Sequence, residues 1–175
     1  MNKIINHIKN NILIYLILIT CLIVIAVVHF YTKGQVDDPV VVDTQYFNVI
    51  DLKETVKLFE DDSPKMLILS VRDCPATEKY VTYVRIVQMK EGFTSYFLDL
   101  NTIKGDEEEF KELLDKLDEF EYDYNGQKGT LKTFLGNTPL TIFIKDGRIV
   151  YGRYGSMNEN VLDSFVTKYG VGKNG

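Results

Sequence analysis

Residues 66–89 read MLILSVRDCPATEKYVTYVRIVQM, and the rest of the chain is best understood from this stretch outward. It opens with an apolar, β-branched run, which predicts a buried strand that ends before Arg72 and Asp73. After Cys74, apolar side chains recur every three or four positions, which predicts a helix with one buried face. Pro75 suits the first helical position because its missing N–H costs no hydrogen bond there. We therefore expect Cys74 at the positive end of a helix dipole, where a thiol ionises more readily than a free one.

The composition is that of one globular domain behind an apolar leader. The chain has 175 residues, of which 45% are apolar, and it contains no repeat. Lys3 and Lys9 are the only formal charges before residue 33, so the remainder holds 18 basic and 25 acidic residues. An acidic domain with scattered basic residues is a poor partner for nucleic acid, so no nucleic-acid binding is expected.

Residues 12–31 form an apolar run about as long as a helix that crosses a membrane. Lys3 and Lys9 precede it, so the positive-inside rule predicts that residues 1–11 are cytoplasmic. The chain is then expected to cross the cell membrane once, at residues 12–31, and to carry its C-terminal domain on the extracytoplasmic side. Residues 32–45 then form a tether that becomes ordered near residues 40–42. Two alternatives stay open, a cleaved signal peptide and a lipid-modified Cys21.

The remaining elements follow from local signals. Asp51 and Glu54 have the spacing of a capping box, and Asp146-Gly147 is a hairpin turn between two apolar strands. The predicted elements after the tether are an edge strand at 46–50, a helix from residue 52, the strand and helix of residues 66–91, a strand at 95–100, a helix at 106–120, a hairpin at 140–154, a helix capped by Asn158 and a mobile tail at 171–175. Strands and helices that alternate before a hairpin predict an α/β fold, with a mixed sheet and helices on both faces.

This order, the cysteine at a helix start and the Thr138-Pro139 pair directly before a strand resemble the thioredoxin-like fold. The chain is most similar to the membrane-anchored bacteriocin-transport-accessory group of Gram-positive bacteria. The resemblance covers residues 46–170 and places a helical insertion at 101–137. It implies a cis peptide bond at Pro139, with Pro139 facing Cys74 and the Thr138 backbone free to pair with a substrate strand.

The chain departs from that family at the second cysteine of its C-x-x-C motif, where Thr77 stands instead. A threonine hydroxyl can stabilise a thiolate, but it cannot resolve a mixed disulfide. Asp73 takes the place of the customary Trp, and its charge is expected to raise the pKa of Cys74. Cys74 and Thr77 are thus the candidate catalytic residues, and the candidate substrate-binding residues are Asp73, Pro75, Thr138 and Pro139.

Two functions fit these residues. The first is a monothiol disulfide oxidoreductase or isomerase that acts on thiols and disulfides of exported proteins or peptides. The second is a redox-inactive thioredoxin-like binding module that assists the export or folding of a partner. Other roles are less favoured, such as a subunit whose Cys74 forms an intermolecular disulfide. We expect no metal and no cofactor, because both histidines lie at the ends of the apolar segment. Exposure of Cys74 should decide between the functions, since an inert thiol would be buried under Tyr80 or Tyr83.

Overall fold

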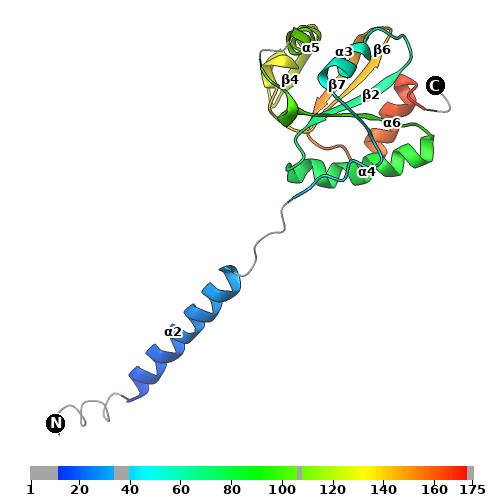
Figure 1. The fold of residues 1–175 in the computed structure, drawn as a ribbon. Helices are drawn as coiled ribbons and strands as arrows, with labels where there is room; N and C mark the ends of the chain where they lie inside the picture. The colour runs from blue at the N-terminus through cyan, green and yellow to red at the C-terminus, as the bar shows by residue number, and fades with distance from the viewer. Residues whose placement is uncertain (1–11, 34–39, 106–107, 173–175) are drawn as a thin grey trace. The chain divides into compact units, whose positions relative to one another are not determined.

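A computed structural model describes residues 12–33, 40–105 and 108–172, and it divides the chain into two compact units, Met1–Asp38 and Pro39–Gly175 (Figure 1). The predicted cytoplasmic segment 1–11 lies outside the described residues, as do residues 34–39 of the tether and 173–175 of the tail.

The described residues of the first unit form the helix α2 (Ile12–Lys33). Its apolar side chains that the structure describes face solvent, as Leu22 does with 67% of its surface exposed. No helix within the described residues is both long and apolar enough to cross a membrane. The predicted transmembrane helix over residues 12–31 is therefore not supported.

The second unit is a five-stranded mixed sheet with helices on both faces. Its strands stand in the order β1-β3-β2-β6-β7, in which β1, β3 and β2 run parallel and β6 and β7 run antiparallel to their neighbours. The elements are β1 (Asn48–Ile50), α3 (Leu52–Lys57), β2 (Lys65–Ser70), α4 (Pro75–Glu91), β3 (Tyr96–Asp99), η1 (Leu100–Thr102), α5 (Glu108–Asp118), β4 (Glu121–Tyr124), β5 (Gln127–Thr130), η2 (Lys132–Phe134), β6 (Leu140–Lys145), β7 (Arg148–Tyr154) and α6 (Glu159–Tyr169). This arrangement confirms the predicted α/β fold with a mixed sheet flanked by helices.

The two faces of the sheet carry separate cores because successive side chains of a strand point to opposite sides. Met66 and Ile68 of β2 join a cluster with α4 and α6, whereas Leu67 and Leu69 join one with α3 and α5. Figure 1 shows α4 and α6 together on one side of the sheet and α3 and α5 on the other. All of β2 is buried, which explains its continuous apolar sequence.

The predicted helix boundaries are confirmed where the sequence carries a cap. Asp51 caps α3, and the Glu54 side chain completes the capping box from the third helical position. Asn158 caps α6 by accepting a hydrogen bond from the Val161 N–H. Gly92 ends α4 with φ +69°, in the left-handed region that glycine enters without strain.

The insertion at 101–137 is not all helical, which corrects the prediction. It contains α5 and η2, but also the antiparallel pair β4–β5, joined by Asn125 and Gly126. Both turn residues have positive φ, +53° and +84°, which is the geometry of a tight hairpin turn. The strands are polar and only half-buried, so their sequences lack the apolar run that revealed the central strands.

The insertion packs against the outer edge of β7. Gly152 on β7 is buried, and a Cβ there would lie 2.4 Å from Leu131 Cδ1, so any larger residue would require Leu131 to move. Two residues further along β7, the Tyr154 N–H donates a hydrogen bond to the Tyr122 hydroxyl at 3.2 Å. The Tyr154 hydroxyl donates in turn to the Leu131 carbonyl. The insertion is thus a fixed part of the second unit.

Candidate functional site

The candidate site lies where the parallel strands end. β2 and β3 finish at Ser70 and Asp99, which are register partners, and the chain then turns into α4. Ligands of open α/β sheets commonly bind beyond the carboxyl ends of such strands. Cys74 stands there as the N-cap residue of α4, with Pro75 at the first helical position, as predicted. Its side chain is partly exposed.

The loop before β6 faces this cysteine. The Thr138–Pro139 peptide bond is cis, as the resemblance implied. The Thr138 hydroxyl donates a hydrogen bond to Cys74 Sγ at 3.2 Å, and Sγ lies 3.7 Å from the Thr138 carbonyl oxygen. Residues 64 positions apart in sequence therefore meet at the thiol. Within the described residues the Thr138 N–H makes no hydrogen bond.

The surroundings of Cys74 lower the pKa of its thiol. Burial acts first and would raise the pKa, but the hydroxyls of Thr138 and Thr77 and the backbone N–H groups of Thr77 and Ala76 lower it by more. The backbone donors belong to the first turn of α4, where N–H groups have no helical partner. The pattern is that of a thiol prepared to ionise.

The Thr77 hydroxyl is not accessible, as a catalytic hydroxyl would be expected to be. Its side chain is fully buried, and its hydroxyl is hydrogen-bonded to the Ser70 hydroxyl at 2.5 Å. Thr77 still contributes to lowering the pKa of Cys74, yet it also links α4 to the end of β2. Ser70 was missed as a site residue, although a serine at the end of an otherwise apolar strand was a signal for it.

Asp73 does not dominate the acidity of Cys74. It is exposed, and its carboxylate accepts a hydrogen bond from Asn101 Nδ2 at 3.5 Å. The groups that act most strongly on the thiol lower its pKa overall, so the increase expected from Asp73 does not prevail. Pro75 is exposed beside Cys74, and Pro139 is buried.

An ion pair that the sequence analysis missed fixes the loop before Cys74. Arg72 Nε lies 3.2 Å from Asp99 Oδ2, and Asp99 is largely buried. The other oxygen of Asp99 accepts the Asn101 N–H, which starts η1. Because parallel strands end at the same edge, polar residues directly after β2 and β3 could have been paired from the sequence.

Neither tyrosine of α4 covers the thiol. Tyr80 is fully buried and accepts a hydrogen bond from the Thr141 hydroxyl, and burial raises its pKa. Tyr83 is 40% exposed. The arrangement predicted for an inert, buried Cys74 is therefore absent from the described part of the chain. Among those same residues, no group of three potential ligands could hold a metal ion.

Comparison with known proteins gives similarity in fold. No family model matches the chain, and no curated protein matches it. Mitochondrial thioredoxin 3 from Saccharomyces cerevisiae is 10% identical over 70% of this chain and 94% of its own, with a TM-score of 0.47. A thioredoxin from Aeropyrum pernix is 15% identical over 68% of this chain and 83% of its own, with a TM-score of 0.46. Chloroplastic thioredoxin z is 11% identical over 72% of this chain and 96% of its own, with a TM-score of 0.49. No residue role in this chain is taken from these similarities.

Proposed function

We propose that the chain is a monothiol thiol–disulfide exchange protein in which Cys74 is the nucleophile. The observation that carries this proposal is the hydrogen bond from Thr138 to Sγ of a partly exposed cysteine at a helix start. A thiolate, and not a thiol, attacks a disulfide, so a group that stabilises Cys74 as thiolate raises the reactive fraction.

The reaction balances with one cysteine when the substrate supplies the second thiol. Cys74 thiolate attacks one sulfur of a substrate disulfide, a new S–S bond forms, and the other substrate sulfur leaves as thiolate. A different cysteine of the substrate then attacks, as thiolate, the substrate sulfur that is bonded to Cys74. The Cys74 thiolate leaves, and the substrate is left with a rearranged disulfide. No electrons are gained or lost overall, so the cycle is an isomerisation. If an external thiol instead attacks Cys74 Sγ in the adduct, the substrate leaves with both of its sulfurs as thiols. A second external thiol then releases Cys74, and the two external thiols end as a disulfide, which balances the reduction of the substrate.

One observation favours the second candidate function, a redox-inactive binding module. Thr77 is buried and hydrogen-bonded to Ser70 at the position where a resolving cysteine would stand. The described part of the second unit contains no other thiol than Cys74. A module of this kind would use the Thr138 backbone to hold an extended partner without forming a covalent bond.

Alkylation of Cys74 as a function of pH separates the two. The experiment uses the full chain with Cys21→Ser, so that Cys74 is the only thiol, and the Cys21→Ser/Cys74→Ser double variant as the blank. We expect the rate of alkylation to be half-maximal at a pH below the free-thiol pKa of about 8.5. We also expect Cys74 to form a mixed disulfide when glutathione disulfide is added. The same chain in denaturant supplies the unperturbed midpoint. A thiol that reacts only after unfolding would contradict the exchange mechanism and favour the binding module.

The location of the domain is a further part of the proposal. We place it outside the cell membrane, acting on exported proteins or peptides, as in the bacteriocin-transport-accessory group. The support is the apolar sequence of residues 12–31 behind Lys3 and Lys9. Membrane pellets washed with alkaline carbonate should retain the full chain and release a chain that begins at Lys33. Release of both would contradict this location.

A further inference from the structure

An apolar pocket lies next to the thiol, on the side built by the insertion. It has a volume of about 240 Å³, and its lining is Leu100, Ile103, Gly105, Phe110, Leu135 and Gly136. None of these described residues is charged, and the four large side chains are half-buried, so each keeps some apolar surface in water. Exposed apolar area of this kind gains free energy when a ligand covers it.

Two separate connections place this pocket beside Cys74. Gly136 stands two residues before Thr138, so their Cα atoms are at most about 7.6 Å apart. On the other wall, Leu100 is followed by Asn101, whose amide donates to Asp73, the residue directly before Cys74. The pocket walls are thus tied to the two chain segments that flank the thiol.

The size of the pocket limits what it can hold. Sites that enclose drug-sized ligands have volumes of roughly 300–1,000 Å³, so this pocket suits one or two side chains instead. The described residues of its lining provide no charged partner for a phosphate or a carboxylate. An extended chain that pairs with the free Thr138 N–H while its cysteine meets Cys74 would carry its neighbouring side chains past the pocket mouth.

We propose that this pocket is a specificity site, which binds a bulky apolar side chain close to the reacting cysteine of a polypeptide substrate. The inference rests on the proposed exchange function, because it assumes that Cys74 forms the mixed disulfide. It selects a substrate class, namely unfolded or extended polypeptides in which an aromatic or aliphatic residue lies within a few positions of the cysteine. Small thiols such as glutathione would react without using the pocket.

The test compares rate constants for mixed-disulfide formation with three symmetric disulfides. These are glutathione disulfide and the disulfide dimers of two neutral peptides, in which residues two positions before and after the cysteine are either Phe or Ser. The protein is the full chain with Cys21→Ser. We expect the Phe peptide to react about tenfold faster than the Ser peptide, since burial of part of an aromatic ring supplies a factor of this size.

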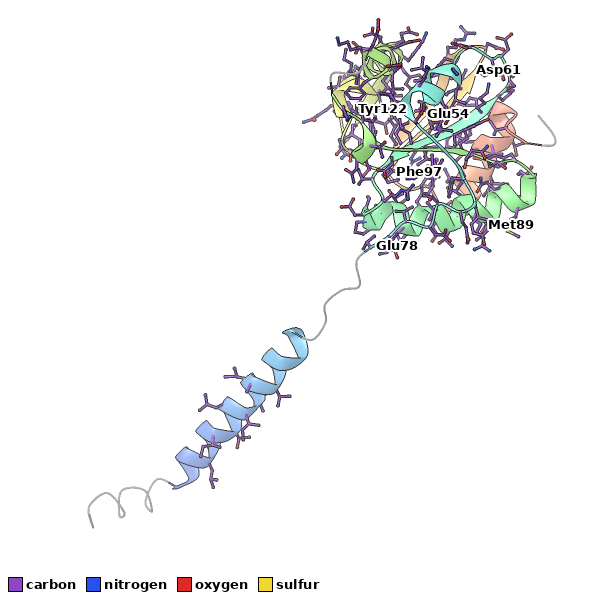
Figure 2. The ribbon with its side chains drawn as sticks, viewed as in Figure 1. Glu54, Asp61, Glu78, Met89, Phe97 and Tyr122 are labelled. Carbon is purple, nitrogen blue, oxygen red and sulfur yellow. The ribbon has the colours of Figure 1, made fainter. Side chains whose placement is uncertain are left out.

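Two pocket variants and one matched control decide the assignment. Gly105→Leu adds a bulky side chain at a residue of the pocket lining, where a Cβ has no described atom within 4 Å and the backbone φ is not positive. Leu135→Asn makes its lining polar. The control Met89→Asn changes another exposed apolar residue, which lies about 22 Å from Cys74 along α4 and near its far end in Figure 2.

Both pocket variants should bring the Phe-to-Ser ratio close to one, while their rates with glutathione disulfide stay at the parent value and show that the site is intact. Met89→Asn should keep the parent ratio. A ratio near one in the parent, or an unchanged ratio in both pocket variants, would overturn the pocket assignment alone. Absence of an adduct with all three disulfides would overturn the exchange function and the assignment with it.

Discussion

The two threonines beside Cys74 carry the same hydroxyl but lie in different environments. Thr138 belongs to the loop before β6, is half-buried, and directs its hydroxyl only at Sγ. Thr77 belongs to the first turn of α4, is fully buried, and bonds to Ser70. The difference shows that one threonine mainly adjusts the thiol, whereas the other mainly joins helix to strand. Three substitutions test this division.

The largest effect is expected from Thr77→Cys, which gives the helix a second thiol where a resolving cysteine would stand. An intramolecular thiol has a very high effective concentration, so the mixed disulfide between Cys74 and glutathione should disappear at least 100-fold faster. Mass spectrometry of acid-quenched samples measures the adduct over time. Cys21→Ser/Thr77→Ser serves as the control, because its hydroxyl cannot resolve the adduct. An adduct of unchanged lifetime in Thr77→Cys would mean that the buried position is inaccessible to the mixed disulfide.

A medium effect is expected on stability from Thr77→Val, which keeps the shape and removes the hydroxyl. Ser70 then loses its buried partner, and the free energy of unfolding should fall by about 1–3 kcal/mol in urea titrations. The double variant Ser70→Ala/Thr77→Val removes both polar groups and should recover part of that loss. If Thr77→Val unfolds at the same urea concentration as the parent, the link between β2 and α4 contributes nothing measurable.

The smallest effect is expected from Thr138→Val, and it concerns acidity instead of stability. Loss of the hydroxyl removes one donor to the thiolate, so the pKa of Cys74 should rise and the alkylation midpoint should move to higher pH. Thr138→Ser keeps the donor and should retain the parent midpoint. A midpoint unchanged in Thr138→Val would show that the Thr77 hydroxyl and the backbone donors of α4 set the acidity without Thr138.

The same lowered pKa predicts how the stability of the parent and of the Thr138→Val chain should depend on pH. The folded pKa of Cys74 is lowered, so its thiolate contacts stabilise the fold at pH values above the pKa of the unfolded thiol. This contribution disappears as the pH falls through the folded pKa. The Thr138→Val chain should therefore unfold more easily than the parent in alkaline solution, and this difference should shrink as the pH falls through the folded pKa of Cys74.

The two hairpins show what the sequence could reveal about the fold. Asp146-Gly147 and Asn125-Gly126 form the same kind of turn, with positive φ at both residues. The first was predicted because it joins strands with apolar runs, and all of β6 but its last residue is buried. The second was missed because β4 and β5 lie at the surface and are held in part by the contact of Tyr122 with Tyr154 of β7, which is distant in sequence. Turn chemistry alone did not identify a strand without a buried face.

The site was predictable to the extent that local rules apply. The N-cap position of Cys74 and the place of Pro75 follow from helix-start preferences, and the meeting with Thr138 followed from the resemblance. The direction of the Asp73 side chain did not follow from the sequence, because it depends on Asn101 across the end of the sheet. The pocket was missed for the same reason, since its lining comes from three separate segments.

The fit of Leu131 against Gly152, with the Tyr122 hydroxyl on the Tyr154 N–H, also bears on how the protein behaves at high concentration. An open strand edge is a template for strands of other molecules and a common start of aggregation. Here the carboxyl half of β7 is covered by the chain's own insertion, and the opposite edge strand, β1, has only three residues. A chain that lost the insertion would expose a backbone edge beside its reactive thiol, and misassembly through that edge would be its characteristic failure.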